Sequence, residues 1–428
     1  MKITRFLACG LLAGIASAMA ETKPTLDSIA EAYVKLALAA GVHDGDYVDA
    51  YYGPPEWRTA AEAAKLPLAE VRSRVQATRR ALEAISDSSP DQMSRQRRLY
   101  LAGELRALDT RLAMVAGEKF SFDEESRLIY DTVAPQHDAA HFDAVLAELD
   151  KALPGAGPVA ARYQAFRNQF VIPPAKLDTV FKAAIAEARA RTLKRIPLPA
   201  GESFTLEYVT NKSWSGYNWF QGNARSVIQI NTDLPIFIDR AVDLAAHEGY
   251  PGHHVYGTLV EQKLMKERGW VEFSVNPLFG PNGIVAEGSG NYGIEVVFPG
   301  EERLKFEREV LFPLAGLDPA KVAEYYRVLE LTKKLSFAGN EAARRYLNAG
   351  ITAADAAAWL EKYSLMEPAR AQQRVKFMEK YRSYVITYNH GQQLVHDYVE
   401  AKAAGDADKR WQAFAELIST PVLPSQLK

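Results

Sequence analysis

Apolar residues recur at helical spacing through most of this chain, and this periodicity restricts its possible folds more than any other feature. Segments such as SIAEAYVKLALAAG and LDTVFKAAIAEARARTLKRI carry apolar residues three or four positions apart, with charges on the other face. Similar segments fill about 25–195 and about 301–418. Between them, SFTLEYV and ARSVIQINT have strand-like patterns and are joined by the turn-rich aromatic segment TNKSWSGYNWFQGN. The sequence predicts a mostly α protein with one small β element at about 202–234.

The length suits one large domain or two closely packed lobes, and we predict a single domain over 21–428. The 428 residues are 48% hydrophobic, which allows a large core, and they contain no internal repeat and no long linker. Within this domain we expect a motif region at 235–300, between the β element and the C-terminal helices. The formal net charge is −2 and charges of both signs are interspersed, so nucleic acid is not expected as a partner.

The first twenty residues have the pattern of a secretory signal peptide. Lys2 and Arg5 precede an apolar run, and the small-x-small site AMA ends at Ala20. We therefore predict cleavage after Ala20 and a periplasmic or secreted protein. The apolar run is too short to span a bilayer and no later run resembles a transmembrane helix, so stable membrane insertion is not expected. Cys9, the only cysteine, leaves lipoprotein processing as an alternative.

The segment AAHEGYPGHHVYG holds three of the eight histidines. His247 and Glu248 match the start of H-E-x-x-H, in which two histidines one helical turn apart bind zinc and the glutamate activates water. Pro251 stands where the second histidine would fall. Because proline lacks an amide hydrogen and disfavours helical geometry before it, we expect one helix to end near Glu248 and another to begin at the histidines. Such a turn can swing His253 or His254 back towards His247, and the spacing leaves both open.

A metal site of this kind needs a third ligand, usually a carboxylate from another helix. The segment GIVAEGSGNYGIEVVF offers Glu287 and Glu295. Glu287 is the better candidate because its flanking residues are apolar, and a buried carboxylate needs a partner. Asn291 follows one turn later on the same face, where it could orient a ligand. The plain structural interpretation is a capped turn at the histidines and a charge near a helix N-terminus at Glu287.

The motif HEGYPGHH, followed by the EG segment, resembles the DUF885 family of bacterial proteins, many of which are exported. Their motif is similar to that of the helical zinc metallopeptidases, which include oligopeptidases, thermostable carboxypeptidases and angiotensin-converting enzyme. The resemblance implies a large helical metallopeptidase-like fold with a central cleft and a small antiparallel β element next to the active-site helix. It also implies a bound Zn²⁺ and hydrolysis of a peptide-like or amide substrate.

The resemblance also implies roles for individual residues. Those peptidases often read H-E-F-G-H, and the local GH here ends at His253. This implies a zinc site of His247, His253 and Glu287, with His254 as the alternative second ligand. Glu248 would then be the general base.

Residues near the C-terminus resemble supporting groups of the same peptidases. Helical zinc peptidases use tyrosines from C-terminal helices to stabilise the oxyanion, which implies this role for Tyr384 and Tyr388. Arg382 is a candidate for bidentate binding of a substrate carboxylate. Each of the three is also compatible with a purely structural role.

Several other features have two interpretations. ARSVIQINT is either the edge strand that holds an extended substrate or a plain hairpin strand. The aromatic residues Trp214, Tyr217, Trp219 and Phe220 either form a cleft wall or pack in the interior. A pair of histidines in HDAAH has the spacing of metal ligands on one helix face but lacks the glutamate, so we interpret it as structural. The remaining histidines, expected at the surface, are His43, His390 and His396.

Two other functions are compatible with the same residues. Two histidines and one carboxylate also describe the metal site of non-haem iron enzymes, which usually lies on a β-barrel and needs no adjacent glutamate. A non-catalytic exported binding protein with a structural or decayed site is the other alternative. The sequence leaves the oligomeric state open.

Overall fold

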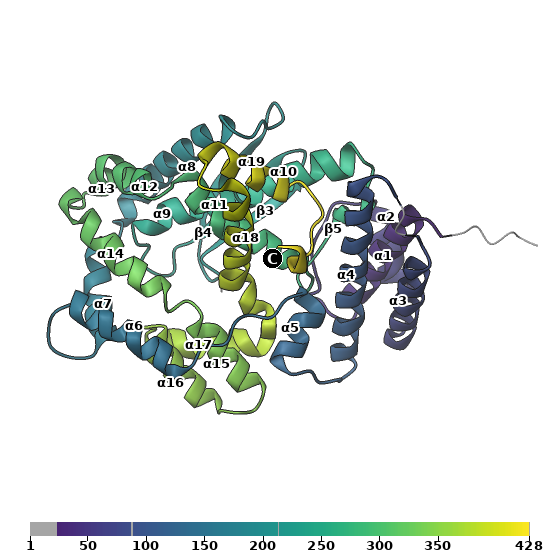
Figure 1. The fold of residues 1–428 in the computed structure, drawn as a ribbon, viewed down its shortest axis with the longest axis horizontal. Coiled ribbons are helices and arrows are strands. Elements are labelled where there is room, and N and C mark those ends of the chain that lie inside the picture. The colour runs from purple at the N-terminus through teal and green to yellow at the C-terminus, as the bar shows by residue number, and fades with distance from the viewer. Residues whose placement is uncertain (1–23, 87–88, 213, 428) are drawn as a thin grey trace, which may run out of the picture.

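Helices dominate the fold, which confirms the predicted mostly α class (Figure 1). The computed structural model describes residues 24–86, 89–212 and 214–427. The predicted signal segment 1–20, with Cys9, lies outside these described residues. In the part of the chain that the structure describes, no helix combines the length and the apolar character needed to cross a bilayer. One large cluster of buried apolar side chains runs from Ile29 to Leu427 and joins the N-terminal and C-terminal helices.

The helices of the first half follow the predicted periodic segments closely. Apolar side chains of these helices are buried, except in Pro55–Ala64. Polar side chains satisfy several of the first amides: Thr25 and Ser121 form capping boxes with the residues three positions later. The bounds are α1 (Leu26–Gly41), α2 (Pro55–Ala64), α3 (Leu68–Glu83), α4 (Gln92–Val115), α5 (Phe122–Tyr130), α6 (Ala139–Ala152), α7 (Val159–Arg167) and α8 (Leu177–Leu193).

The β element at 203–231 has three strands in the order β2-β4-β3. Its strands are β2 (Ser203–Val209), β3 (Gly216–Gly222) and β4 (Arg225–Asn231). The aromatic segment that we expected to be a loop thus forms β3. It pairs antiparallel with β4, whereas β2 runs parallel to β4. A second, antiparallel sheet pairs β1 (Val48–Tyr51) with β5 (Val275–Pro277).

The motif region follows the three-stranded sheet. Its elements are α9 (Asp239–Leu244), the π-helical turn η3 (Ala245–Gly249), α10 (His253–Leu259), the π-helical segment η4 (Val260–Lys266) and α11 (Asn282–Val297). The helix break that Pro251 predicts is confirmed: η3 ends at Gly249, Tyr250 has extended backbone angles, and α10 begins at His253.

The C-terminal helices place α18 directly against α11 (Figure 1). Two glycines allow this contact: a Cβ at Gly288 would lie 2.4 Å from the carbonyl oxygen of Gly391. The two backbones therefore touch, which brings the first turn of α18 close to Glu287. The bounds are α12 (Glu301–Phe306), α13 (Phe312–Ala315), α14 (Val322–Lys333), α15 (Ala338–Leu347), α16 (Ala353–Tyr363), α17 (Pro368–Tyr381), α18 (Ile386–Ala403) and α19 (Ala407–Leu417).

Candidate metal centre

The turn between η3 and α10 folds the chain back on the helix that precedes it. The amide of Tyr250 donates to the carbonyl oxygen of Ala245 at 3.0 Å, and the amide of Gly252 donates to that of Ala246 at 2.9 Å. These hydrogen bonds join residues five and six positions apart, whereas those of an α-helix join residues four apart, so the turn is wider than an α-helical one. A Cβ at Gly252 would lie 1.9 Å from the carbonyl oxygen of His247, so only glycine fits at this point.

Replacing Gly252 by alanine is therefore expected to destabilise the protein by about 1–3 kcal/mol or more, because the added methyl group meets backbone that cannot move aside. Thermal or urea unfolding measures the effect. Gly339→Ala is the matched control, because a Cβ at Gly339 meets nothing within 4 Å and alanine favours its helix. Equal stability of the two variants would contradict the proposed steric role of Gly252.

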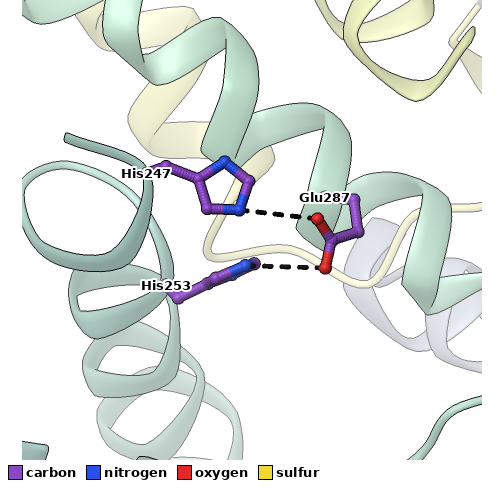
Figure 2. Close-up of side chains that lie close together, drawn as sticks. All are labelled: His247, His253 and Glu287. Atoms are coloured by element: carbon purple, nitrogen blue, oxygen red, sulfur yellow. Dashed lines mark ion pairs between the residues drawn. The ribbon is translucent and has the colours of Figure 1, made fainter. Parts of the chain in front are cut away.

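The turn brings His253 opposite His247, and both histidines face Glu287 of α11. Figure 2 shows the three side chains pointing toward one another from separate segments. The two imidazole rings lie 4.6 Å apart, centroid to centroid, at nearly a right angle. One donor atom from each of the three residues lies within 4.8 Å of the other two. The residues that sequence analysis chose as ligands are therefore neighbours in the structure.

The distances from the two histidine nitrogens to the carboxylate oxygens of Glu287 are longer than those of direct hydrogen bonds. Nε2 of His247 lies 3.4 Å from Oε2 of Glu287, and Nε2 of His253 lies 3.6 Å from Oε1. Hydrogen bonds of this type are about 2.7–3.2 Å long. In a tetrahedral zinc site with bonds of about 2.0–2.1 Å, neighbouring donors are about 3.4 Å apart. Oε2 of Glu287 is also buried without a hydrogen-bond partner among the described residues.

The site is electrostatically suited to a positive charge. Burial lowers the pKa of His253, but contact with Glu287 and the charges of Glu248 and Asp49 raise it to about 9. Burial raises the pKa of Glu287, yet its contacts with His247 and His253 hold it well below its usual range. The carboxylates therefore create a negative field around the histidine nitrogens, and such a field attracts a metal cation.

His247 is oriented by α11. Its Nδ1 lies 3.1 Å from Oδ1 of Asn291, and the amide nitrogen of Asn291 donates to the carbonyl oxygen of Tyr388 at 3.1 Å. This contact leaves Nε2 directed at Glu287, an arrangement that metal-binding histidines commonly have. The ring packs closely over Gly290, where a Cβ would lie 2.9 Å from Cε1 of His247.

Glu248 lies beside this cluster on the side of the three-stranded sheet. Its side chain is buried, and its Oε2 accepts no hydrogen bond from the described residues. A Cβ at Gly216 of β3 would lie 3.1 Å from its Oε1. The side-chain amide of Asn218 donates to the backbone oxygen of Glu248 at 2.7 Å, which links β3 to the motif. The contacts of Gly216 and Asn218 were not predicted, because the turn residues of this segment favoured a loop.

His254 points away from the cluster into the protein interior. It is fully buried, with Nε2 3.0 Å from Oε2 of Glu202 and Nδ1 2.8 Å from Oγ of Ser226. Glu202 also accepts hydrogen bonds from Tyr250 and Arg189. The second histidine of the pair therefore anchors α10 to the sheet, while the first faces Glu287.

The anchor around Glu202 is expected to make stability depend on acid pH. Burial raises the pKa of Glu202, but its bonds to His254, Tyr250 and Arg189 lower it from 4.5 to about 2. A carboxylate with a lowered pKa stabilises the folded state above its unfolded pKa, and this contribution is lost as pH falls through the folded pKa. The difference in stability between wild type and E202Q, measured by urea unfolding, should therefore narrow between pH 5 and about pH 2. A difference in unfolding free energy that stays constant over this pH range would contradict the stabilising role of ionised Glu202.

Arg382, the predicted carboxylate-binding residue, is already paired. Its Nε donates to Oε2 of Glu125 at 2.6 Å, and the amide and hydroxyl of Ser383 donate to Oε1 of the same residue. Arg382 has a positive φ of 51°, so the helical segment is broken here and Tyr384 lies in the short turn η8 (Arg382–Val385). Glu125 accepts hydrogen bonds from the backbone and side-chain groups at this break. It therefore already pairs with the guanidinium that we expected to bind substrate.

The two predicted tyrosines lie close to the cluster. The hydroxyl of Tyr384 lies 3.4 Å from Oε1 of Glu287, and the rings of Tyr384 and Tyr388 meet edge to face at 5.7 Å. Burial raises the pKa of both hydroxyls, and the charge of Glu287 adds to this effect. Both groups therefore stay protonated near neutral pH and are able to donate hydrogen bonds.

The strand predicted to hold substrate is the central one. Because β4 pairs with β2 and β3 on its two sides, it has no free edge. The strand beside Glu248 is β3, whose outer edge pairs with no described strand. Of the aromatic residues of β3, Phe220 packs on Tyr52, whereas Trp219 is 45% exposed. The hydroxyl of Tyr217 donates to both carboxylate oxygens of Asp49.

The other histidines do not join a metal cluster in the described part of the chain. His137 and His141 stack at 4.5 Å between ring centroids, but no third donor lies near enough to complete a site among the described residues. His43 contacts the carbonyl oxygen of Leu66, and His396 is exposed. The expectation that His390 lies at the surface is wrong, because it is buried beside Thr132.

Comparisons with known proteins show the fold. No family model and no curated protein matches the chain. A protein of Colwellia psychrerythraea named a putative lipoprotein has a similar structure. Its TM-score is 0.53 at 12% identity, over 95% of this chain and 76% of that one. At this identity the likeness concerns the fold alone.

Two further solved structures align less well. One is named a putative lipoprotein of unknown function from Shewanella oneidensis, with a TM-score of 0.45 and 12% identity over 93% of this chain and 81% of that one. The other is an M32 carboxypeptidase from Deinococcus radiodurans R1, with a TM-score of 0.44 and 14% identity over 92% of this chain and 91% of that one. No conclusion is drawn from these two, because both scores lie below 0.5.

Proposed function

We propose that this chain is a metal-dependent hydrolase of peptide or amide bonds, with His247, His253 and Glu287 as ligands of Zn²⁺. The observation that carries this proposal is the convergence of His247, His253 and Glu287, with one ligand atom from each within 4.8 Å of the others. They lie beside a buried carboxylate oxygen of Glu248 that accepts no hydrogen bond from the described residues. The resemblance of the HEGYPGHH motif to the DUF885 family supports it.

The surrounding side chains are suited to hydrolysis. Zinc, when bound, supplies a Lewis acid that polarises the substrate carbonyl and the attacking water. Glu248 accepts a proton from that water at its free Oε2 and returns it to the leaving nitrogen. Tyr384 and Tyr388, which stay protonated, donate hydrogen bonds to the oxygen that gains negative charge. Asn291 holds the ring of His247 in the orientation that this site requires.

The substrate we propose is an extended, peptide-like chain. An edge strand binds such a chain through its unpaired backbone groups. Among the described residues β3 is an edge strand of its sheet, and its Gly216 lies beside Glu248. An oxygenase would have no use for a buried free carboxylate at this position, so Glu248 favours a hydrolase over a non-haem iron enzyme. We also propose that the protein acts outside the cytoplasm, from the signal pattern of residues 1–20 and the name of the similar Colwellia psychrerythraea protein.

Metal analysis of the purified protein, combined with peptide-library hydrolysis, tests this function. We expect about one zinc per chain, loss of hydrolysis after chelation, and recovery when zinc is restored. Iron in place of zinc would support the non-haem iron alternative. A chain that binds no metal would support the non-catalytic binding protein, and it would overturn the proposal.

A further inference from the structure

Arg382 and Ser383 form a sharp backbone turn directly before Tyr384. Arg382 has a φ of 51° and a ψ of −123°, a combination that glycine adopts readily and that a residue with a side chain adopts only with strain. Because α17 ends and η8 begins at this turn, the backbone angles of Arg382 determine where Tyr384 lies. Strained backbone persists only where the surrounding structure holds it in place.

Glu125 of α5 holds this turn in place. It is only 2% exposed, and both of its carboxylate oxygens accept hydrogen bonds from the turn. Oε2 accepts from Nε of Arg382 at 2.6 Å, whereas Oε1 accepts from the backbone amide of Ser383 at 3.1 Å and from its hydroxyl at 2.6 Å. One buried carboxylate therefore binds the side chain of the strained residue and the backbone of the next residue.

Tyr384, the residue after the turn, contacts the metal centre. Its hydroxyl lies 3.4 Å from Oε1 of Glu287, the same oxygen that lies 3.6 Å from Nε2 of His253. Its ring packs edge to face against Tyr130 at 6.3 Å, and Tyr130 is the last residue of α5, the helix that carries Glu125. A continuous series of contacts thus joins Glu125 to a proposed metal ligand.

We propose that Glu125 is a positioning residue, which fixes Tyr384 at the metal centre by holding the strained turn before it. In the described part of the chain, no hydrogen bond or ion pair joins Glu125 to Glu287 or to the two histidines of the cluster. Its effect on the site therefore passes through Tyr384. Hydrogen bonds to metal ligands orient them and tune metal affinity. The inference rests on the function proposed above, since it adds a residue to that site.

Crystal structures of the metal-free wild type and its variants test the placement of Tyr384. In E125A we expect Arg382 to leave its positive φ and the hydroxyl of Tyr384 to lie farther from Glu287. The double variant E125A/R382G should bring the hydroxyl back, because glycine adopts these backbone angles without help from a carboxylate. E125Q, which keeps the shape of the side chain, replaces E125A if that variant does not fold. A Tyr384 hydroxyl that keeps its place in these Glu125 variants would overturn the proposal.

Zinc affinity, measured with a competing chelator, tests whether this placement matters to the metal centre. E125A and Y384F should each lower zinc affinity by about tenfold, at the lower end of the effects of residues behind metal ligands. The double variant E125A/Y384F should lose no more affinity than Y384F, because both changes remove the same contact. Losses that multiply to about 100-fold would show that Glu125 acts by another route. They would overturn the proposal, and so would wild-type affinity in both single variants.

E272Q is the matched control for a general loss of stability. Glu272 is fully buried and pairs with Arg97, so this variant also weakens a buried ion pair. Glu272 lies outside the cluster of potential metal ligands among the described residues. We therefore expect E272Q to lose stability and to keep wild-type zinc affinity. A tenfold loss of affinity in E272Q would attribute the effect of E125A to stability alone and overturn the proposal.

Peptide hydrolysis distinguishes this inference from the proposed hydrolase function. If wild type hydrolyses peptides, E125A should lower kcat by about tenfold or more and leave KM unchanged, because Tyr384 acts on the oxygen that gains charge. Zinc binding without hydrolysis by wild type would refute the hydrolase, whereas coupled losses of zinc affinity in E125A and Y384F would still sustain the role of Glu125. Hydrolysis by E125A at the wild-type kcat would do the reverse.

Discussion

An E248Q variant is expected to keep its metal and to lose hydrolytic activity by about 10²–10⁴-fold. Glutamine has the shape of glutamate, so the buried position beside Gly216 is preserved. It cannot take a proton from the attacking water, and this is the role that the free Oε2 of Glu248 is suited to perform. Metal content by mass spectrometry and kcat on a cleaved peptide are the two measurements.

E295Q is the matched control for this variant. Glu295 lies on α11 with Glu287, but it accepts a hydrogen bond from Gln392 at 3.1 Å and lies outside the metal cluster of the described residues. We expect this control to retain both metal and activity. If E248Q hydrolyses peptides at the wild-type rate, another group is the base and the assignment of Glu248 is wrong.

Single replacements of the two adjacent histidines are expected to have opposite effects. H253A should lower zinc affinity by more than about 100-fold, since even residues behind the ligands are worth about 10–100-fold. H254A should retain zinc but lower stability, because it leaves Glu202 and Ser226 without their buried partner. An unsatisfied buried polar group costs about 1–3 kcal/mol.

Zinc titration with a competing chelator and thermal unfolding distinguish the two variants. If the proposed site is right, H253A loses zinc affinity, and H254A loses stability even when both proteins are metal-free. The reverse pattern would make His254 the ligand, and the arrangement of η3 and α10 described above would then have to change when metal binds.

Much of the local structure was predictable because it depends on residues that are close in sequence. The apolar spacing of the segment before Gly41 predicts α1, and the same argument applies to the other long helices. Pro251 predicts the helix break, since its effect acts on its immediate neighbours. The apolar flanks of Glu287 singled it out for the same reason. These inferences need no knowledge of what lies across the molecule.

The pairing of the strands was beyond such local reasoning. Alternation predicts that 203–209 and 225–231 are strands, but it carries no information about whether they run parallel. The turn residues around Trp219 favoured a loop, and the hydrogen bonds of β4 override this local preference in β3. Only the tertiary structure places β4 in the centre and leaves β2 and β3 at the two edges of this sheet in the described part of the chain.

The sequence by itself determined the long helices and the chemical groups available, including a histidine-glutamate pair followed by two histidines after a break. Only the tertiary structure decided which groups are free to act. His254 and Arg382 are occupied by carboxylates 52 and 257 residues away in sequence. The reason is physical: periodicity determines the face on which a side chain lies, but long-range packing determines the group it meets there.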